Sequence, residues 1–211
     1  MPFDFKKEPL YRAAQQPQIV QVPPCNYLAV RGQGDPNQPQ GSYQQAISIL
    51  YAVAYTLKIS PKNGYSIVGF FDYVVPPLEG FWWQEAAEIL PRDKSSFHWI
   101  SALRLPDFVR LTDFEWAVRT AEHKKKLDCS SAEFLRVEEG LCAQILHTGS
   151  FDSEQESISR MNAFVGEQDY QPDLSRTRLH HEIYLSDARK VSPEKRKTIL
   201  RQPIKRIGRA F

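Results

Sequence analysis

A regular alternation of apolar and polar positions predicts a strand over residues 179–185, near the C-terminal end of the chain. The segment is rich in apolar and β-favouring side chains. With a period of two, His180, Glu182 and Tyr184 share one face of this strand. Carboxylates are rarely buried without a partner, so these residues alone favour a half-exposed strand with a wet polar face over a binding site.

Helical spacing of apolar side chains predicts three helices, over about residues 42–58, 111–125 and 153–165. Ser153 and Glu156 have the spacing of a capping box, which predicts that the third helix starts at Ser153.

Further strands are expected over 18–22, 25–31, 65–75, 97–105, 134–137, 141–146 and 198–204. Pro203 lies near the end of the last of these strands. Because proline has no backbone N–H to donate, we expect that strand at the edge of a sheet.

The order of these elements repeats along the chain. Residues 18–110 and 130–205 each contain a strand, a turn with glycine and aspartate, a helix, a strand with an acid inside it, and a further strand. The acid is Asp72 in the first half and Glu182 in the second. This repeat predicts an α+β fold, in which two β-α-β-β halves form one antiparallel sheet with two main helices on one face.

The composition is that of an ordinary globular protein of 211 residues, 42% of them hydrophobic. Residues 1–17 are expected to form an N-terminal arm, and residues 18–211 a single domain made of the two pseudo-symmetric halves. The 27 basic and 25 acidic residues nearly balance, which argues against binding to nucleic acid through bulk charge. No direct nucleic-acid partner is therefore expected.

The three cysteines are widely spaced, which predicts neither a disulfide framework nor a zinc ribbon. The N-terminal residues lack the apolar region of a signal peptide. The most apolar segment, residues 46–57, is too short to span a bilayer. These features predict a soluble, cytoplasmic protein with reduced thiols and no membrane partner.

The sequence contains no G-x-S-x-G, H-E-x-x-H or P-loop motif. His180 and His181 are adjacent on the predicted strand and point to opposite faces, so they cannot easily share one metal ion. We therefore expect neither a bound metal nor a cofactor.

Aromatic residues gather in the segments that would border a cleft between the two halves, where ligands often bind. Aromatic faces bind flat hydrophobic molecules and cations, but several of these rings could simply build the core. Trp82 and Trp83 differ, because adjacent strand residues cannot both face one core. At least one of them is expected to line a surface or a cavity.

Several segments resemble the GyrI-like small-molecule-binding family: residues 72–83, 141–149, 180–187 and 195–203. The most specific motifs are Gly80-Phe81-Trp82-Trp83 and His181-Glu182-Ile183-Tyr184-Leu185. The resemblance extends over about residues 5–205 and implies the tandem β-α-β-β fold, which SOUL-like, haem-binding relatives share. No histidine here has the sequence context of an axial haem ligand, so haem is not expected.

The resemblance also implies a role for Glu182. In multidrug-sensing members the matching carboxylate lies at the base of an aromatic pocket and meets cationic drugs. Some stand-alone members are cyclopropanoid cyclopropyl hydrolases, which give resistance to DNA-alkylating xenobiotics by adding water to a strained ring. We expect a cofactor-independent hydrolase of this kind, acting on a flat hydrophobic or cationic small molecule. A non-catalytic drug-binding module and a DNA gyrase inhibitor are the alternatives.

In this interpretation Glu182 is the general base or orients the water. Tyr55 or Tyr184 would donate a hydrogen bond to the substrate carbonyl, where negative charge develops. The side chains expected to contact the ligand are Tyr73, Glu79, Phe81, Trp82, Trp83, Trp99 and His180.

Overall fold

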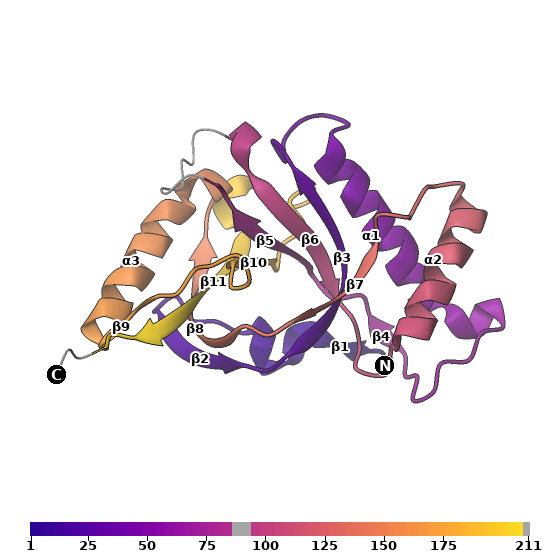
Figure 1. Cartoon of the computed structure of the whole chain (residues 1–211), viewed down its shortest axis with the longest axis horizontal. Coiled ribbons are helices and arrows are strands. Elements are labelled where there is room, and N and C mark those ends of the chain that lie inside the picture. The colour runs from indigo at the N-terminus through magenta and orange to yellow at the C-terminus, as the bar shows by residue number, and fades with distance from the viewer. Residues whose placement is uncertain (86–93, 209–211) are drawn as a thin grey trace. The chain divides into compact units, whose positions relative to one another are not determined.

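The computed structural model describes residues 1–85 and 94–208, and these residues form two compact units. The first unit contains residues 1–5, 25–85 and 94–137, and the second contains residues 6–24 and 138–208 (Figure 1). The second unit is therefore assembled from both ends of the chain, so the predicted arm of residues 1–17 divides between the units.

The first unit is a four-stranded antiparallel sheet covered by helices. Its strands are ordered β5 (Leu78–Trp83), β6 (His98–Arg104), β3 (Cys25–Gln33) and β7 (Glu133–Val137). Helix α1 (Ser42–Lys58) packs on β3 and β6, and α2 (Leu111–Lys125) packs on α1. A short parallel pair, β1 (Phe3–Asp4) and β4 (Tyr73–Val74), completes this unit.

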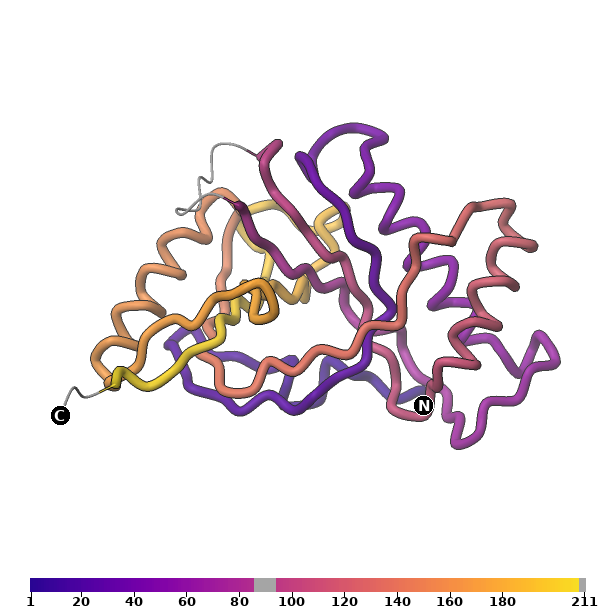
Figure 2. Tube along the Cα trace, viewed as in Figure 1, coloured from indigo at the N-terminus to yellow at the C-terminus, as the bar shows by residue number. Residues whose placement is uncertain are grey.

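The second unit repeats this arrangement. Its antiparallel strands are ordered β2 (Gln18–Val22), β8 (Gly140–Thr148), β11 (Lys197–Arg206) and β10 (His180–Tyr184), and β9 (Tyr170–Pro172) pairs with the far end of β11. Helix α3 (Glu154–Glu167) packs on β8 and β11. Figure 2 shows the early segment with β2 running alongside β8, far later in the sequence.

The two units share one topology. The order β3-α1-β5-β6 in the first unit corresponds to β8-α3-β10-β11 in the second, and the strand orders β5-β6-β3-β7 and β10-β11-β8-β2 match position for position. The predicted tandem β-α-β-β repeat and the α+β fold class are confirmed. Short 3-10 helices occur at Phe5–Lys7, Pro9–Tyr11, Ser60–Asn63, Lys94–Ser96, Phe151–Ser153 and Pro193–Lys195.

Each unit has its own hydrophobic core between its main helix and its sheet. In the first unit, Leu50 and Val53 of α1 are buried against a cluster that includes Leu103 and Trp99. The core of the second unit consists of Ala143, Ile145, Met161, Val165, Leu200 and Ile204. No helix in the described part of the chain is long and apolar enough to cross a membrane.

The strand predicted over residues 65–75 is wrong for most of its length. Only Tyr73 and Val74 are extended and paired, because the chain turns at Gly69, which has a φ of +80°. Asp72 therefore does not occupy the middle of a strand; its exposed carboxylate pairs with Lys58 at 3.0 Å.

The prediction of an edge strand around Pro203 is also wrong, since β11 lies between β8 and β10. On the side opposite β8, pairing with β10 ends at Arg201 and pairing with β9 begins at Ile204. Pro203 falls in the gap between these two partners, where its carbonyl accepts a hydrogen bond from the Asp173 N–H at 2.8 Å. A proline is tolerated inside the sheet at such a break in the ladder.

Candidate carboxyl site on the second unit

The centre of the candidate site is Glu182, in the middle of β10. As the period of two predicts, His180 and Tyr184 share its face. The Tyr184 hydroxyl donates a hydrogen bond to Glu182 Oε2 at 2.7 Å, and His180 Nε2 lies 3.3 Å from Glu182 Oε1. The Glu182 side chain is 14% exposed, so this carboxylate is partly desolvated but still open to a ligand.

A second carboxyl group meets Glu182 from α3. Glu154, the first residue of that helix, is 6% exposed. Burial raises the pKa of Glu154 well above its usual value, and the neighbouring charge of Glu182 raises it further. A hydrogen bond between the two carboxyl groups acts in the same direction, whereas the Thr198 hydroxyl lowers this pKa. Glu154 therefore favours its protonated form, beside the Glu182 carboxylate.

One buried carboxyl oxygen on this face, Glu154 Oε1, has no hydrogen-bond partner among the described residues. The same carboxyl group lies beside the Thr198 hydroxyl and the Glu182 carboxylate. Thr198 lies opposite Tyr184 in the pairing of β10 with β11, so these atoms border one stretch of the sheet. Buried polar groups are normally satisfied, so this stretch retains unused capacity to bind a water molecule or a polar ligand group.

The opposite face of β10 carries a closed ionic network. His181 Nδ1 lies 3.0 Å from Glu139, and Arg201 donates to Glu139 at 3.2 Å and to Gln144 at 3.0 Å. Burial favours the neutral acid, but the charges of His181 and Arg201 outweigh it and lower the pKa of Glu139 to about 2. Arg201 and Gln144 also donate to the carbonyls of Leu10 and Arg12, at 2.8 and 3.0 Å. This network fixes β10 from behind and confirms that the adjacent histidines face opposite sides.

An aromatic pair borders the carboxyl site within the same unit. The exposed ring of Phe151 meets Tyr184 edge-to-face, with ring centroids 5.7 Å apart. The Arg196 guanidinium lies 5.3 Å from the centre of the Phe151 ring. The site thus combines one negative charge with an apolar edge, which suits flat or cationic ligands.

The first unit carries the predicted tryptophans on the two faces of β5. Trp82 contacts Tyr43 and Phe97, on the side where α1 packs. Trp83 stacks on His98 with ring centroids 5.3 Å apart. Neither tryptophan is fully buried, so both have surface available for a ligand.

The other predicted ligand contacts on the first unit are interior residues. Trp99 is 1% exposed and belongs to the core under α1. Tyr73, Glu79 and Phe81 are also buried. Their burial leaves these four side chains almost no surface for contact with a ligand.

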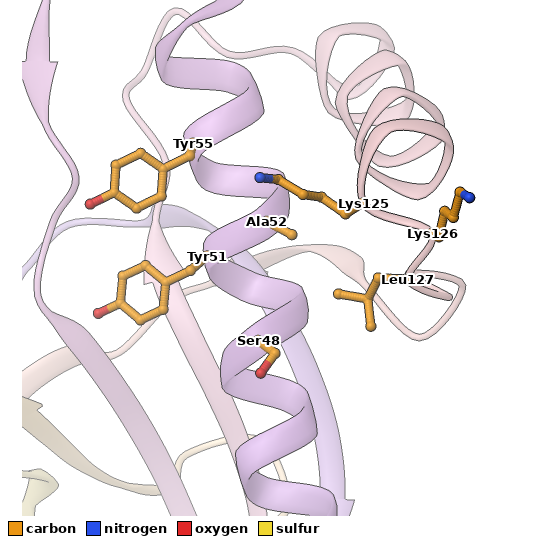
Figure 3. A pocket seen from close by; sticks show the side chains of 7 residues that line it. All are labelled: Ser48, Tyr51, Ala52, Tyr55, Lys125, Lys126 and Leu127. Atoms are coloured by element: carbon orange, nitrogen blue, oxygen red, sulfur yellow. The ribbon is translucent and has the colours of Figure 1, made fainter.

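Tyr55 lies in an open groove of the first unit. The groove has a volume of about 460 Å³ and is lined by Ser48, Tyr51, Ala52, Tyr55, Lys125, Lys126 and Leu127. Figure 3 shows Tyr51 and Tyr55 projecting to the same side of α1, away from Lys126 and Leu127. Within the described residues, no group of three or more His, Cys, Asp or Glu side chains could hold a metal ion.

Comparison with known proteins identifies the family. Residues 15–205 match the model of the GyrI-like small molecule binding domain. The chain belongs to this family. No curated protein matches the chain.

Solved structures from Listeria innocua are similar to this GyrI-like chain over nearly its whole length. One, described as a hydrolase, is 42% identical with a TM-score of 0.87 and covers 96% of this chain and 100% of its own. Another, described as an uncharacterized conserved protein, is 44% identical with a TM-score of 0.90 and the same coverage.

A more distant match is the C-terminal domain of EcmrR, at 10% identity and a TM-score of 0.57, covering 90% of this chain and 98% of that domain. At this identity the likeness shows a shared fold only.

Glu154 and Thr198 are the site residues that the sequence analysis missed. Glu154 stands at the start of a helix, where an acid is expected for its interaction with the helix dipole, so it carried no signal of its own. The capping box predicted from Ser153 and Glu156 is absent, because the Ser153 hydroxyl donates to the Ser150 carbonyl at 2.8 Å.

Proposed function

We propose that this protein hydrolyses flat, electrophilic small molecules by water addition, and that cyclopropane-bearing DNA-alkylating compounds are its substrate class. The observation that carries the proposal is the carboxyl pair of Glu154 and Glu182. One carboxylate and one carboxylic acid in contact supply a base with a fixed proton donor beside it. The likeness to a Listeria innocua protein described as a hydrolase supports enzymatic activity.

The reaction requires little from the protein, because the substrate is already activated by ring strain and a conjugated carbonyl. The Glu182 carboxylate takes a proton from water while the water oxygen bonds to a cyclopropane carbon. The ring C–C bond breaks, and its electron pair moves through the dienone to the carbonyl oxygen, which gains a proton to become a phenol. The product is the substrate plus one water molecule, so no cofactor or oxidant is consumed.

Each neighbour of Glu182 has a distinct part in this scheme. Burial and the neighbouring Glu182 raise the pKa of Glu154 and favour its neutral form, and Tyr184 fixes the orientation of the Glu182 carboxylate. His180, whose Nε2 lies 3.3 Å from Glu182 Oε1, holds the other oxygen of that carboxylate. Phe151, which meets Tyr184 edge-to-face beside Glu182, is proposed to contact the apolar part of the substrate. The family resemblance makes Trp82 and Trp83 further candidates for contact with a ligand.

The test is the turnover of a spirocyclopropane-dienone compound in water enriched in ¹⁸O, followed by mass spectrometry. We expect the wild type to form a product with one added, labelled water, and Glu182→Gln to lose this activity by about 100-fold or more. Glu156→Gln, which changes an exposed acid on α3, the helix that carries Glu154, is the matched control and should retain activity.

Equal rates for wild type and Glu182→Gln would contradict the proposed mechanism. Tight binding without hydration would indicate instead a non-catalytic drug-binding module. This alternative agrees with the family description, which names small-molecule binding. The gyrase-inhibitor alternative is tested separately, by adding the protein to a DNA gyrase supercoiling assay.

A further inference from the structure

His147 connects the end of β8 to the start of α3 through both of its ring nitrogens. Nε2 lies 3.1 Å from the Ser150 carbonyl oxygen, and Nδ1 lies 2.9 Å from Ser157 Oγ. A carbonyl oxygen only accepts hydrogen bonds, so Nε2 carries the hydrogen and Nδ1 of the neutral ring accepts from Ser157. His147 is 5% exposed and Ser157 is 8% exposed, so these bonds are shielded from water.

These bonds act on a helix start that has no side-chain cap of its own. Ser153, at the N-cap position, makes no side-chain hydrogen bond to the helix backbone; its hydroxyl donates to Ser150 instead and lies 3.3 Å from His147 Nε2. Residues on both sides of the first turn of α3 are therefore held by one imidazole ring rather than by a capping box.

The turn before α3 is closely fitted to this ring. Gly149 has a φ of +152°, which residues with side chains rarely adopt. A Cβ atom at this position would lie 2.8 Å from Ser153 Oγ and 3.0 Å from His147 Nε2. Glycine is needed here because the backbone turns directly against the histidine.

His147 lies in the same row of paired residues across the sheet as two residues of the carboxyl site. His147 pairs with Thr198 across β8 and β11, and Thr198 pairs with Tyr184 across β11 and β10. Ser157 is three residues after Glu154, so the two side chains are neighbours on α3. The bond from His147 to Ser157 thus sets the position of the helix face that presents Glu154.

We propose that His147 is a positioning residue that holds the first turn of α3, and with it the Glu154 carboxyl group, against Glu182. Its consequence for catalysis rests on the proposed function. The positioning itself is a property of the folded chain and can be measured without a substrate.

The direct test is the titration of the Glu154 carboxyl carbon by ¹³C NMR in the wild type and in His147→Ala. The groups that face Glu154 are Glu182 on β10, Thr198 on β11 and Asp152 in the preceding turn. If His147 holds Glu154 against Glu182, its loss should lower the Glu154 titration midpoint by about one pH unit or more, because the acid moves toward water. The exposed His123, replaced by alanine, is the matched control and should leave the midpoint unchanged.

An unchanged Glu154 midpoint in a folded His147→Ala protein would overturn the proposal. Circular dichroism establishes whether the variant folds. If it does not, Ser157→Ala removes one of the two bonds and should shift the midpoint in the same direction, and no shift there would overturn the proposal equally.

A double-mutant cycle separates positioning from a general structural role. His147→Ala should lower kcat by about tenfold in the wild-type background, and far less in the Glu154→Gln background, if it acts through Glu154. Equal losses in both backgrounds would contradict an action through Glu154. If the wild type hydrates no compound, the proposed function fails, while the NMR titration still decides the role of His147.

Discussion

Glu154 and Glu182 bring two carboxyl groups into contact, one from the first residue of a helix and one from the middle of a strand. The helix contributes the buried partner, whose pKa is raised by burial and by the Glu182 charge, and the strand contributes the partly exposed one. This asymmetry gives two chemically identical side chains different environments, and it has consequences for stability as well as for reactivity.

Glu154→Gln should change how the stability of the protein depends on pH. A carboxyl whose pKa is raised by folding stabilises the folded state fully below its unfolded value near 4.5, and that contribution is lost as the pH rises through the folded value. Glutamine cannot ionise, so the melting temperature of the variant should fall less than that of the wild type between about pH 5 and about pH 9. Differential scanning calorimetry across this range, with Glu156→Gln as control, measures the effect; parallel curves for variant and wild type would contradict it.

Tyr184→Phe should impair activity more than stability. The substitution removes a hydrogen bond to a charged carboxylate, worth about 1.5–3 kcal/mol, and frees one oxygen of Glu182 to rotate. We expect kcat/KM to fall by about tenfold or more with the Glu182 base still present. Tyr170→Phe is the control, because the Tyr170 ring packs under Arg206 in another part of the same unit. An unaltered kcat/KM would show that Tyr184 does not orient the base.

Glu139→Gln should be severely destabilising. The substitution leaves the Arg201 guanidinium, 2% exposed, without its charged partner, and breaking a buried ion pair in this way costs about 3–5 kcal/mol. Chemical denaturation measures this loss.

The lowered pKa of Glu139 also sets the direction of its pH dependence. Its contribution to stability is present above the usual carboxyl pKa of 4.5 and is lost as the pH falls toward about 2. Glu139→Gln should therefore differ from wild type most at neutral pH and least in acid. A stability difference that stays constant down to about pH 2 would contradict this assignment.

Gly32→Ala should lower the stability of the folded protein, whereas Gly166→Ala should raise it. A Cβ at Gly32 would lie 2.2 Å from two atoms of the Trp99 ring, so the core must shift, at a cost of about 1–3 kcal/mol. A Cβ at Gly166 of α3 meets nothing within 4 Å and should stabilise that helix by about 0.5–1 kcal/mol. Thermal unfolding of the two variants makes the comparison, and a stable Gly32→Ala protein would show that Trp99 can move.

Trp83→Ala should weaken binding of a spirocyclopropane-dienone ligand by about tenfold, since the indole offers one of the aromatic faces proposed to contact it. Trp82→Ala should weaken binding similarly and also lower the melting temperature, because Trp82 packs beside the core of the first unit. Trp116→Ala, which removes a ring stacked on Tyr65, is the control. Fluorescence titration with the ligand gives the affinities, and unchanged affinity in both Trp82→Ala and Trp83→Ala would exclude these tryptophans from the site.

Most of the fold could be predicted because hydrophobic periodicity is a local property of each helix and strand, and because the same order of elements occurs in both halves of the chain. Helical and strand periodicity identified α1, α2, α3 and most long strands, and the order of elements revealed the repeat. The two main errors were at residues 65–75 and at Pro203. In both places the backbone outcome depends on partners distant in sequence. Tyr73 and Val74 pair with the N-terminal β1, and Pro203 lies in the gap between β9 and β10.

Only the part of the site that lies on β10 could be predicted from the sequence. The period of two placed His180, Glu182 and Tyr184 on one face correctly, because that geometry is a property of the strand itself. Glu154 and His147 could not be predicted in their roles, since each depends on how α3 packs on β8 and β11. Trp99 shows the converse, because its residue type suggested a ligand contact while tertiary packing buries it against Gly32.

Arg201 and Gln144 donate hydrogen bonds to the carbonyls of Leu10 and Arg12, which are made much earlier during protein synthesis. These contacts impose an order on folding during synthesis. Residues 6–24 leave the ribosome early, but their partners in the second unit arrive only after about the whole first unit has been made. Residues 6–24 therefore lack their packing partners until the second unit has been made. Residues 25–137 can already fold on contacts among themselves. Glu182 gains its surroundings only when β11 has been added, so a nascent chain cannot expose a finished carboxyl site before its last long strand is complete.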